Sequence, residues 1–345
     1  MTEFAVTNAS TGEVEQTFDS LPAQQIPEII ERAHRAVGPW RDTPIAQRAQ
    51  ALAKVGDLFE QRAEELAGII GREMGKLKSE GLQEVQLVAS IFRWYAEHGP
   101  DVLEPTELQP QGAQKTIVEH EPLGVLLGIM PWNFPYYQLA RFAAPNLLIG
   151  NTILMKQAAI CPLSAGTFAE ILHEAGIPED AYINLYLDTE DVPAVLEDFR
   201  VRGVSLTGSE RAGASVAQNA GKNLKKSVLE LGGNDPFLVI DDENLEWVLD
   251  QFNLIRMYNT GQACNAPKRL IVLEDFYDRT VEYLEKKIGD MKVGTYDDEN
   301  ADIGPLSSIG ARDEIVERLE KAAANGDAKI RVGGKKIDRE GAYME

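Results

Sequence analysis

Short apolar runs alternate with helical segments between residues 123 and 219, and this alternation restricts the fold more than any other feature of the chain. The runs 124–130, 152–155, 182–186 and 203–206 have the length and composition of buried strands. Because helical periodicity occupies the intervals, each strand must be joined to the next by a crossover connection. We therefore predict an α/β fold with a doubly wound parallel sheet, which binds ligands beyond the carboxyl ends of its strands.

Helical and strand patterns continue on both sides of this region. Residues 106–121 alternate around Pro110-Gln111-Gly112, which predicts a two-stranded hairpin. Further strands are expected at 237–240 and 270–273. Apolar residues at three- and four-residue spacing predict helices over 26–36, 46–74, 80–97, 136–149, 163–175, 192–199, 210–219, 245–258, 277–288 and 311–325.

Length and charge limit the domain count and the kind of partner. A chain of 345 residues with 44% hydrophobic residues is long enough for two domains, which we place at residues 1–229 and 230–345. The 34 Lys and Arg against 55 Asp and Glu give a net charge of −21, which argues against nucleic acid or an anionic membrane as partner and favours a small molecule. Neither a long apolar span nor an N-terminal leader pattern is present, so we predict a soluble cytoplasmic protein.

The two cysteines, Cys161 and Cys264, cannot form a disulfide framework and have no metal-ligand spacing with the four histidines, so no metal site is expected. Cys264 lies in a polar turn, 259–264, rather than in an apolar run. A thiolate there could attack a carbonyl carbon, with Glu230, beside two glycines, as a base. The alternatives are a small buried cysteine and a surface carboxylate. We interpret Cys161 as structural.

Polar residues follow the predicted strands at their carboxyl ends. Asn133 comes just after the first strand in a stiff frame of prolines, where its amide could donate to a developing oxyanion. Lys156 ends the second strand and could pair with a phosphate or a ribose hydroxyl, or could be a solvated charge. Gly208 and Ser209 open a helix whose N-terminus suits a pyrophosphate, although Ser209 could equally be an ordinary helix cap.

Five separate segments agree in order and spacing with one family: 131–135, Lys156, 207–209, 230–233 and 259–264. On these residues the chain resembles the aldehyde dehydrogenase superfamily. Within it the chain is similar to the short succinate-semialdehyde dehydrogenases, through residues 206–213 and 266–269.

The resemblance implies a reaction that passes through a covalent intermediate. Cys264 would be the nucleophile that forms a thiohemiacetal, whose oxyanion the Asn133 amide would hold. Hydride would pass to a nicotinamide, and Glu230 would then activate water to hydrolyse the thioester. The resemblance also implies contacts to the cofactor from Trp132, Asn133, Lys156, Ala159, Gly208, Ser209 and Leu231.

The same resemblance carries expectations about cofactor and substrate. Family members that use NAD commonly have a Glu three residues after the strand-end Lys; Ala159 stands there, which favours NADP over NAD. Arg141 matches an Arg that would clamp the substrate carboxylate, although Tyr258 replaces a second Arg of that clamp. Arg141 could instead be a helix-surface ion-pair partner.

The end of the sequence also departs from the family pattern. Residues 333–339 resemble the middle of the family's catalytic domain, and the sequence stops at Glu345, so we predict a C-terminally truncated chain with an incomplete second α/β domain. Full-length relatives are expected to be homo-oligomers, with the hairpin 105–122 as an oligomerisation element. The alternative to an aldehyde-oxidising enzyme is an inactive relative that only binds nucleotide or a homologous subunit.

Overall fold

The computed structural model describes residues 3–109, 112 and 114–345. The chain divides into two compact units. The described residues of Met1–Ala5, Thr17–Leu66 and Gln83–Leu231 form the first unit, and Val6–Gln16, Ala67–Leu82 and Gly232–Glu345 form the second. Within the described ranges, no helix has the length and apolar character needed to cross a membrane.

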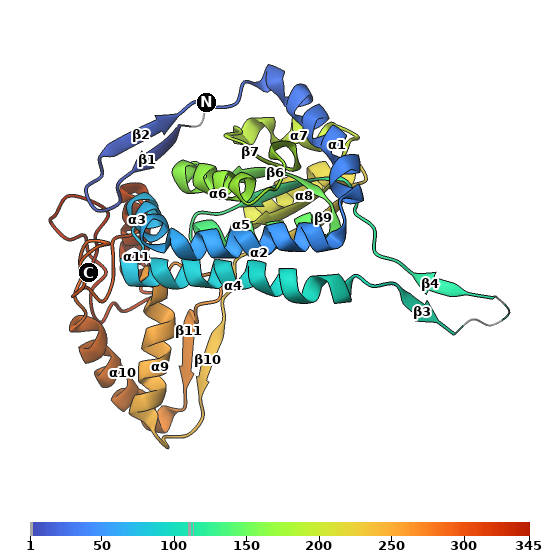
Figure 1. The fold of residues 1–345 in the computed structure, drawn as a ribbon. Coiled ribbons are helices and arrows are strands. Elements are labelled where there is room, and N and C mark those ends of the chain that lie inside the picture. Colours follow the sequence, from blue (N-terminus) through green and yellow to red (C-terminus); the bar gives the residue numbers. More distant parts are fainter. Residues whose placement is uncertain (1–2, 110–111, 113) are drawn as a thin grey trace. The chain divides into compact units, whose positions relative to one another are not determined.

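A five-stranded parallel sheet forms the centre of the first unit (Figure 1). This confirms the parallel sheet that the alternating pattern predicts. One of its strands lies at the sheet edge and lacks the apolar run used for prediction, because only Val228 and Leu229 of its five residues are apolar. In spatial order the strands are β7 (Tyr182–Asn184), β6 (Thr152–Gln157), β5 (Val125–Met130), β8 (Val201–Thr207) and β9 (Lys226–Glu230).

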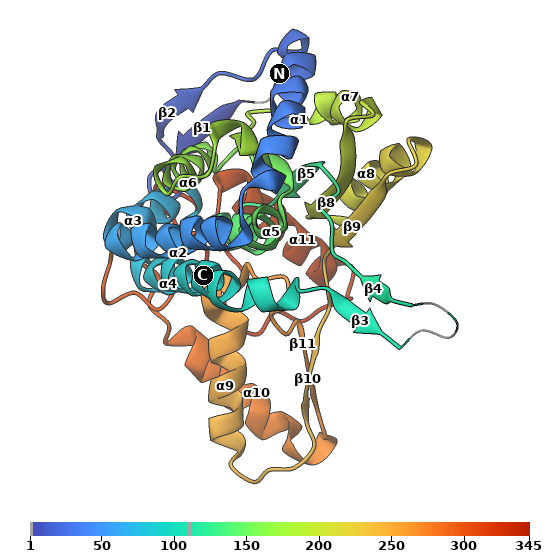
Figure 2. The same ribbon diagram turned by 45° about the vertical axis from the view of Figure 1, so that its right-hand side comes forward.

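Helices cover both faces of this sheet, as a doubly wound fold requires (Figure 2). One face is covered by α1 (Ile26–Asp42), α7 (Val192–Glu197) and α8 (Glu210–Lys222), which share an apolar core with β5, β6 and β8. The other face is covered by α5 (Pro135–Ile149) and α6 (Pro162–Glu174), and α2 (Ile45–Gln61) packs outside them. Short 3₁₀ turns complete the connections at Ala23–Gln25, Glu179–Ala181 and Thr189–Asp191.

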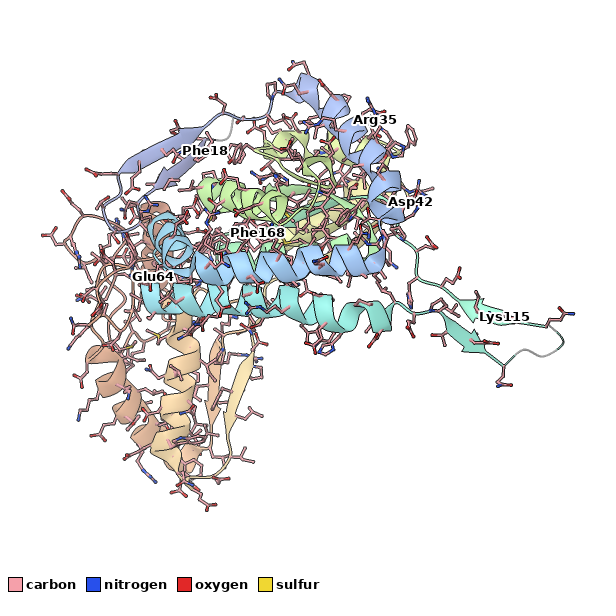
Figure 3. The ribbon with its side chains drawn as sticks, viewed as in Figure 1. Phe18, Arg35, Asp42, Glu64, Lys115 and Phe168 are labelled. Carbon is pink, nitrogen blue, oxygen red and sulfur yellow. The ribbon has the colours of Figure 1, made fainter. Side chains whose placement is uncertain are left out.

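Aromatic rings join the outer helices to the sheet. The Phe59 ring lies 5.7 Å from that of Phe168 and 5.6 Å from that of Tyr136, and Phe168 lies 5.6 Å from Tyr182. Figure 3 shows Phe168 inside this helical layer. Phe92 adds a ring from α4 (Lys78–Val102), 6.4 Å from Phe59. Packed aromatic rings of this kind bury large apolar areas, so they fix the helices against the sheet.

The predicted hairpin is present as β3 (Thr106–Leu108) and β4 (Thr116–Val118), paired antiparallel with Thr106 opposite Val118. Pro110 and Gln111 of its predicted turn lie outside the described residues. All the residues of the two strands are exposed, and the hairpin extends beyond the end of α4, with Lys115 on it (Figures 1 and 3). Among the described residues, the two strands pair only with each other, and their side chains are open to solvent.

The second unit contains a parallel pair, β10 (Pro236–Val239) and β11 (Arg269–Val272), beside α9 (Leu245–Met257) and α10 (Glu274–Gly289). Val239, Leu245 and Leu249 form its buried centre. A 3₁₀ turn, Tyr258–Gly261, follows α9, and α11 covers Ile309–Ala324.

Two early segments group with the second unit rather than with the rest of residues 1–229. The Ala9 N–H donates to the Arg72 carbonyl at 3.0 Å, and the Ala342 N–H donates to the Ala9 carbonyl at 2.9 Å. Such contacts between residues far apart in the chain leave no local pattern in the sequence. The same part of the chain holds the pair β1 (Phe4–Thr7) and β2 (Val14–Phe18), for which no strands are predicted.

The spacing of apolar residues predicts one helix over 46–74, and the structure instead has two, α2 and α3 (Ala63–Met74). The interruption falls at Arg62, whose backbone (φ −102°, ψ 17°) is not helical. Neither Gly nor Pro marks this position, so the helical pattern continues through the break unchanged.

Candidate active site

Asn133 lies in the connection between β5 and α5. Pro135 occupies the first position of α5, where its missing N–H costs no hydrogen bond. The next two N–H groups, of Tyr136 and Tyr137, donate to Oε1 of Glu84 at 2.9 and 3.0 Å. A carboxylate at a helix N-terminus is favourable because of the free N–H groups and the helix dipole. Glu84 thus holds the start of α5 and, with it, the connection that carries Asn133.

The sequence motifs do not identify Glu84. Only 1% of the residue is exposed, and it lies one turn from the buried Val88 on the same face of α4. A charged residue in the apolar stripe of a helix is the signal that could have revealed it, since buried carboxylates need partners.

Lys156 lies in β6 opposite Ile129 of β5, and one further residue, Gln157, completes the strand. Only 8% of the residue is exposed, and burial lowers the pKa of its ammonium group, while the charge of Asp188 raises it. A bound anion would restore part of the solvation that the ammonium has lost. Ala159 follows in the loop after the strand and has no charge to compete with such an anion.

Ser209 caps α8, because its side chain accepts a hydrogen bond from the Ala212 N–H at 3.3 Å. The Gly208 N–H donates to the Glu230 carbonyl at 2.9 Å, so this N–H is not free for a ligand as the sequence pattern suggests. Thr207 Oγ1 is buried and has no hydrogen-bond partner among the described residues. A buried hydroxyl without a partner is uncommon and marks a place where a polar ligand could bind.

Glu230 ends β9, and its Oε1 lies 3.8 Å from Nη2 of Arg141 on α5. The side chains are 54% and 32% exposed, so this ion pair is weak and easily exchanged. The Arg141 guanidinium also lies 5.9 Å from the centre of the Tyr137 ring. Arg141 therefore has an ion-pair partner, as its second interpretation holds, and that partner is the predicted general base.

Arg141 also lines a cavity of about 390 Å³ in the first unit. The remaining wall is largely apolar and includes Leu126, Met130, Phe142 and Val228. Lys226 is a second cation in this wall, and basic side chains in a largely apolar cavity suit a short chain that ends in a carboxylate.

Cys264 is exposed, whereas Cys161 is buried with its Sγ 3.8 Å from the Trp132 carbonyl. In the second unit the turn 259–264 begins with consecutive left-handed residues, at Asn259 and Thr260 (both φ 55°) and Gly261 (φ 73°). We call residues 259–264 the cysteine turn.

Contacts from its surroundings fix the cysteine turn. The Ser307 N–H donates to Gln262 Oε1 at 3.0 Å, and Thr260 Oγ1 donates to the Gly304 carbonyl at 3.3 Å. Lys268 Nζ donates to the carbonyls of Ala263 and Cys264 and lies 3.6 Å from the Asp235 carboxylate. The conformation that presents the thiol is thus set by contacts with residues outside the motif.

Asn133, Lys156, Arg141 and Glu230 belong to the first unit, and Cys264 belongs to the second. The approach of Cys264 to Asn133 and Glu230 therefore stays a prediction. Among the described residues, no cluster of His, Cys, Asp and Glu could hold a metal ion.

The chain belongs to the aldehyde dehydrogenase family, whose model matches residues 1–345. It is 46% identical to the succinate-semialdehyde dehydrogenase [NADP(+)] of Deinococcus radiodurans, over 99% of this chain and 71% of that relative. It is 40% identical to succinate-semialdehyde dehydrogenase [NADP(+)] 1 of Mycobacterium bovis, over 98% of this chain and 74% of that relative.

Solved structures of enzymes with the same kind of name are also similar to this chain. Succinic semialdehyde dehydrogenase from Streptococcus pyogenes, in complex with NADP+, matches with a TM-score of 0.95 and 38% identity, over 99% of this chain and 74% of that one. The succinate-semialdehyde dehydrogenase from Burkholderia pseudomallei matches with a TM-score of 0.94 and 31% identity, over 100% of this chain and 71% of that one.

Proposed function

We propose that this protein oxidises succinate semialdehyde to succinate, with NADP as the hydride acceptor. The observation that carries the proposal is the ion pair at the end of β9, where Arg141, the predicted carboxylate clamp, lies 3.8 Å from Glu230, the predicted base. The names of the relatives described above support the same substrate and cofactor.

The chemistry proceeds in two stages on Cys264. Its thiolate attacks the aldehyde carbon, forming a C–S bond, while the Asn133 amide and the Cys264 N–H hold the oxyanion. A nicotinamide cofactor, when bound, would accept the hydride that leaves this carbon. Glu230 then takes a proton from water, the water oxygen adds to the thioester carbon, and the C–S bond breaks to release the acid. The sum is aldehyde, water and oxidised cofactor to acid, reduced cofactor and a proton.

The residues of the first unit fit a dinucleotide that carries a 2′-phosphate. Lys156 is a buried ammonium that could pair with this phosphate, and Ala159 offers no carboxylate to repel it. The buried Thr207 hydroxyl and the first turn of α8 supply hydrogen-bond donors for the rest of the cofactor. Trp132, Gly208, Ser209 and Leu231 are proposed as further contacts.

We also propose that the chain forms a homo-oligomer through the β3–β4 hairpin. Leu108, Ile117 and Val118 are 45%, 41% and 45% exposed there, and exposed apolar side chains on a short strand pair favour association.

The experiment follows reduced-nicotinamide absorbance with succinate semialdehyde and NADP, beside a Cys264→Ser control. We expect turnover by the unchanged chain and a loss on the order of a thousandfold or more in the control, since the nucleophile is removed. Nucleotide binding without any turnover would contradict the proposal and favour a relative that binds nucleotide without catalysis.

A further inference from the structure

The cysteine turn has a backbone that one of its residues strongly disfavours. Asn259 and Thr260 both adopt left-handed conformations, in which the Cβ of an L residue is crowded. Asn enters this region more readily than most residues, whereas Thr260 carries an additional branch at Cβ. Such a conformation persists only when the surrounding structure enforces it. The residues that enforce it thereby decide where Cys264 is presented.

Glu80 contacts the first residue of this turn. Its Oε1 accepts a hydrogen bond from the Asn259 N–H at 2.8 Å, across 179 residues of sequence. Glu80 also accepts from the backbone N–H of Leu77, at the start of α4, as the Glu of a capping box does. One carboxylate therefore joins a helix end to the entry of the cysteine turn, and all these residues belong to the second unit.

The environment makes this contact hard to replace. Asn259 is completely buried, so water cannot substitute for a lost acceptor at its N–H. Oε2 of Glu80 is buried as well. Within the turn, the Gln262 side chain donates to the Asn259 carbonyl at 3.1 Å. Contacts from outside the turn reach its later residues, and they come from Arg256, Lys268, Gly304 and Ser307.

We propose that Glu80 is a positioning residue: its carboxylate holds the left-handed turn that presents the Cys264 thiol to the substrate. The catalytic consequence rests on the proposed function, in which Cys264 is the nucleophile. The contact itself does not.

Protonation of Glu80 would weaken this hold. Burial raises the pKa of Glu80, while the Asn259 N–H, the charge of Lys76 and the Leu77 N–H each lower it. Lys76, which is fully buried, is the charged group that faces the carboxylate. Because the Asn259 N–H lowers this pKa, the N–H binds the ionised carboxylate more tightly than the protonated one. Protonation as the pH falls therefore weakens this contact, even though burial favours the protonated form.

The test compares the unchanged chain with Glu80→Ala, Glu80→Gln and a control, Glu274→Gln, which removes a first-turn carboxylate from α10 in the same unit. Deuterium exchange is measured on peptides that cover residues 258–264. We expect exchange at least roughly tenfold faster in Glu80→Ala, within about threefold of the unchanged chain in Glu80→Gln, whose amide oxygen can accept the same N–H, and unchanged in Glu274→Gln.

The same variants are assayed for succinate-semialdehyde oxidation. We expect kcat to fall roughly tenfold or more in Glu80→Ala, while KM for NADP stays within about twofold of the value for the unchanged chain. In Glu80→Gln we expect most of the kcat of the unchanged chain to be kept. Equal exchange and equal kcat in Glu80→Ala and the unchanged chain would overturn the proposal.

If Glu80→Ala fails to fold, which the loss of a cooperative melting transition would show, the proposal is tested with Glu80→Gln instead. Corrected for intrinsic rates, exchange in the cysteine turn should increase at low pH in the unchanged chain but not in Glu80→Gln; the same pH response in both would refute the role. An unchanged chain without turnover contradicts the proposed function, while the exchange results still decide the contact.

Discussion

At the scale of single residues, the charged groups of the candidate site differ in how much water they keep. Lys156 is buried, whereas Glu230 and Arg141 remain partly exposed and lie 3.8 Å apart. A buried cation has a strong requirement for an anionic partner, while an exposed pair exchanges partners at little cost. On the proposed function, we therefore expect Lys156 to select the cofactor and Arg141 to release Glu230 when a substrate carboxylate binds.

Cofactor preference is testable at Ala159. In Ala159→Glu we expect kcat/KM for NADP to fall roughly tenfold or more, about 1.4 kcal/mol, because a carboxylate would repel the 2′-phosphate. The kcat/KM for NAD should stay level or rise, since the carboxylate could accept hydrogen bonds from the ribose hydroxyls. Steady-state kinetics with both cofactors measure this, and an equal loss for NAD and NADP would contradict the proposed location of the phosphate.

Substrate recognition is testable at Arg141. In Arg141→Ala we expect KM for succinate semialdehyde to rise roughly tenfold to a hundredfold, from the loss of a charge-assisted hydrogen bond of about 1.5–3 kcal/mol. KM for butanal, which has the same chain length without the carboxylate, should change little. Similar increases for both aldehydes would show that Arg141 does not recognise the carboxylate.

At the scale of elements, local patterns identify the strands and helices that carry their own apolar signature. Four of the sheet strands and the helices between them follow directly from apolar runs and helical spacing. The strand β9 does not, because its conformation comes from pairing with β8, where Thr207 lies opposite Glu230. The position of Glu230 at the end of this strand is thus a product of tertiary pairing.

An ion-pair network stabilises the entry to β8. Asp198 lies 2.5 Å from Arg200, which also pairs with Glu31 on α1 at 2.6 Å. The hydrogen bonds from the Arg200 side chain lower the pKa of Asp198 below its usual value of 3.8. The folded chain therefore binds this proton less tightly than the unfolded chain, so the contribution to stability is complete above the usual pKa and is lost as the pH falls through the lowered one.

This network predicts the behaviour of Asp198→Asn. We expect the variant to lose about 1–3 kcal/mol of unfolding free energy at pH 7, because Arg200 keeps its charge but loses an ionised partner. This loss of unfolding free energy should shrink as the pH is lowered to about 3 and below, because Asp198 of the unchanged chain then becomes protonated as well. Urea unfolding across this pH range measures both, and a deficit that does not vary with pH would contradict the assignment.

At the scale of the whole molecule, the exposed hairpin predicts self-association. In Ile117→Lys we expect the dissociation constant of the homo-oligomer to rise roughly tenfold or more, since a charge replaces an apolar contact. The matched control is Leu224→Lys, which adds the same charge at a side chain that is 96% exposed in the turn after α8. Sedimentation velocity over a range of concentrations compares them; equal effects would exclude the hairpin as the interface.

The sequence by itself determined the class of fold and predicted the chemistry. Cys264, Glu230, Asn133 and Lys156 stand in local motifs, and the parallel sheet follows from a periodic pattern, because both signals are contained in neighbouring residues. Only the tertiary structure decided what holds these groups. Glu80 and Glu84 find their partners 179 and 52 residues away, and segments 6–16 and 67–82 join the second unit through equally distant contacts. The physical reason is that a buried carboxylate is stabilised by whichever N–H groups the fold brings to it, and no local pattern records which groups those will be.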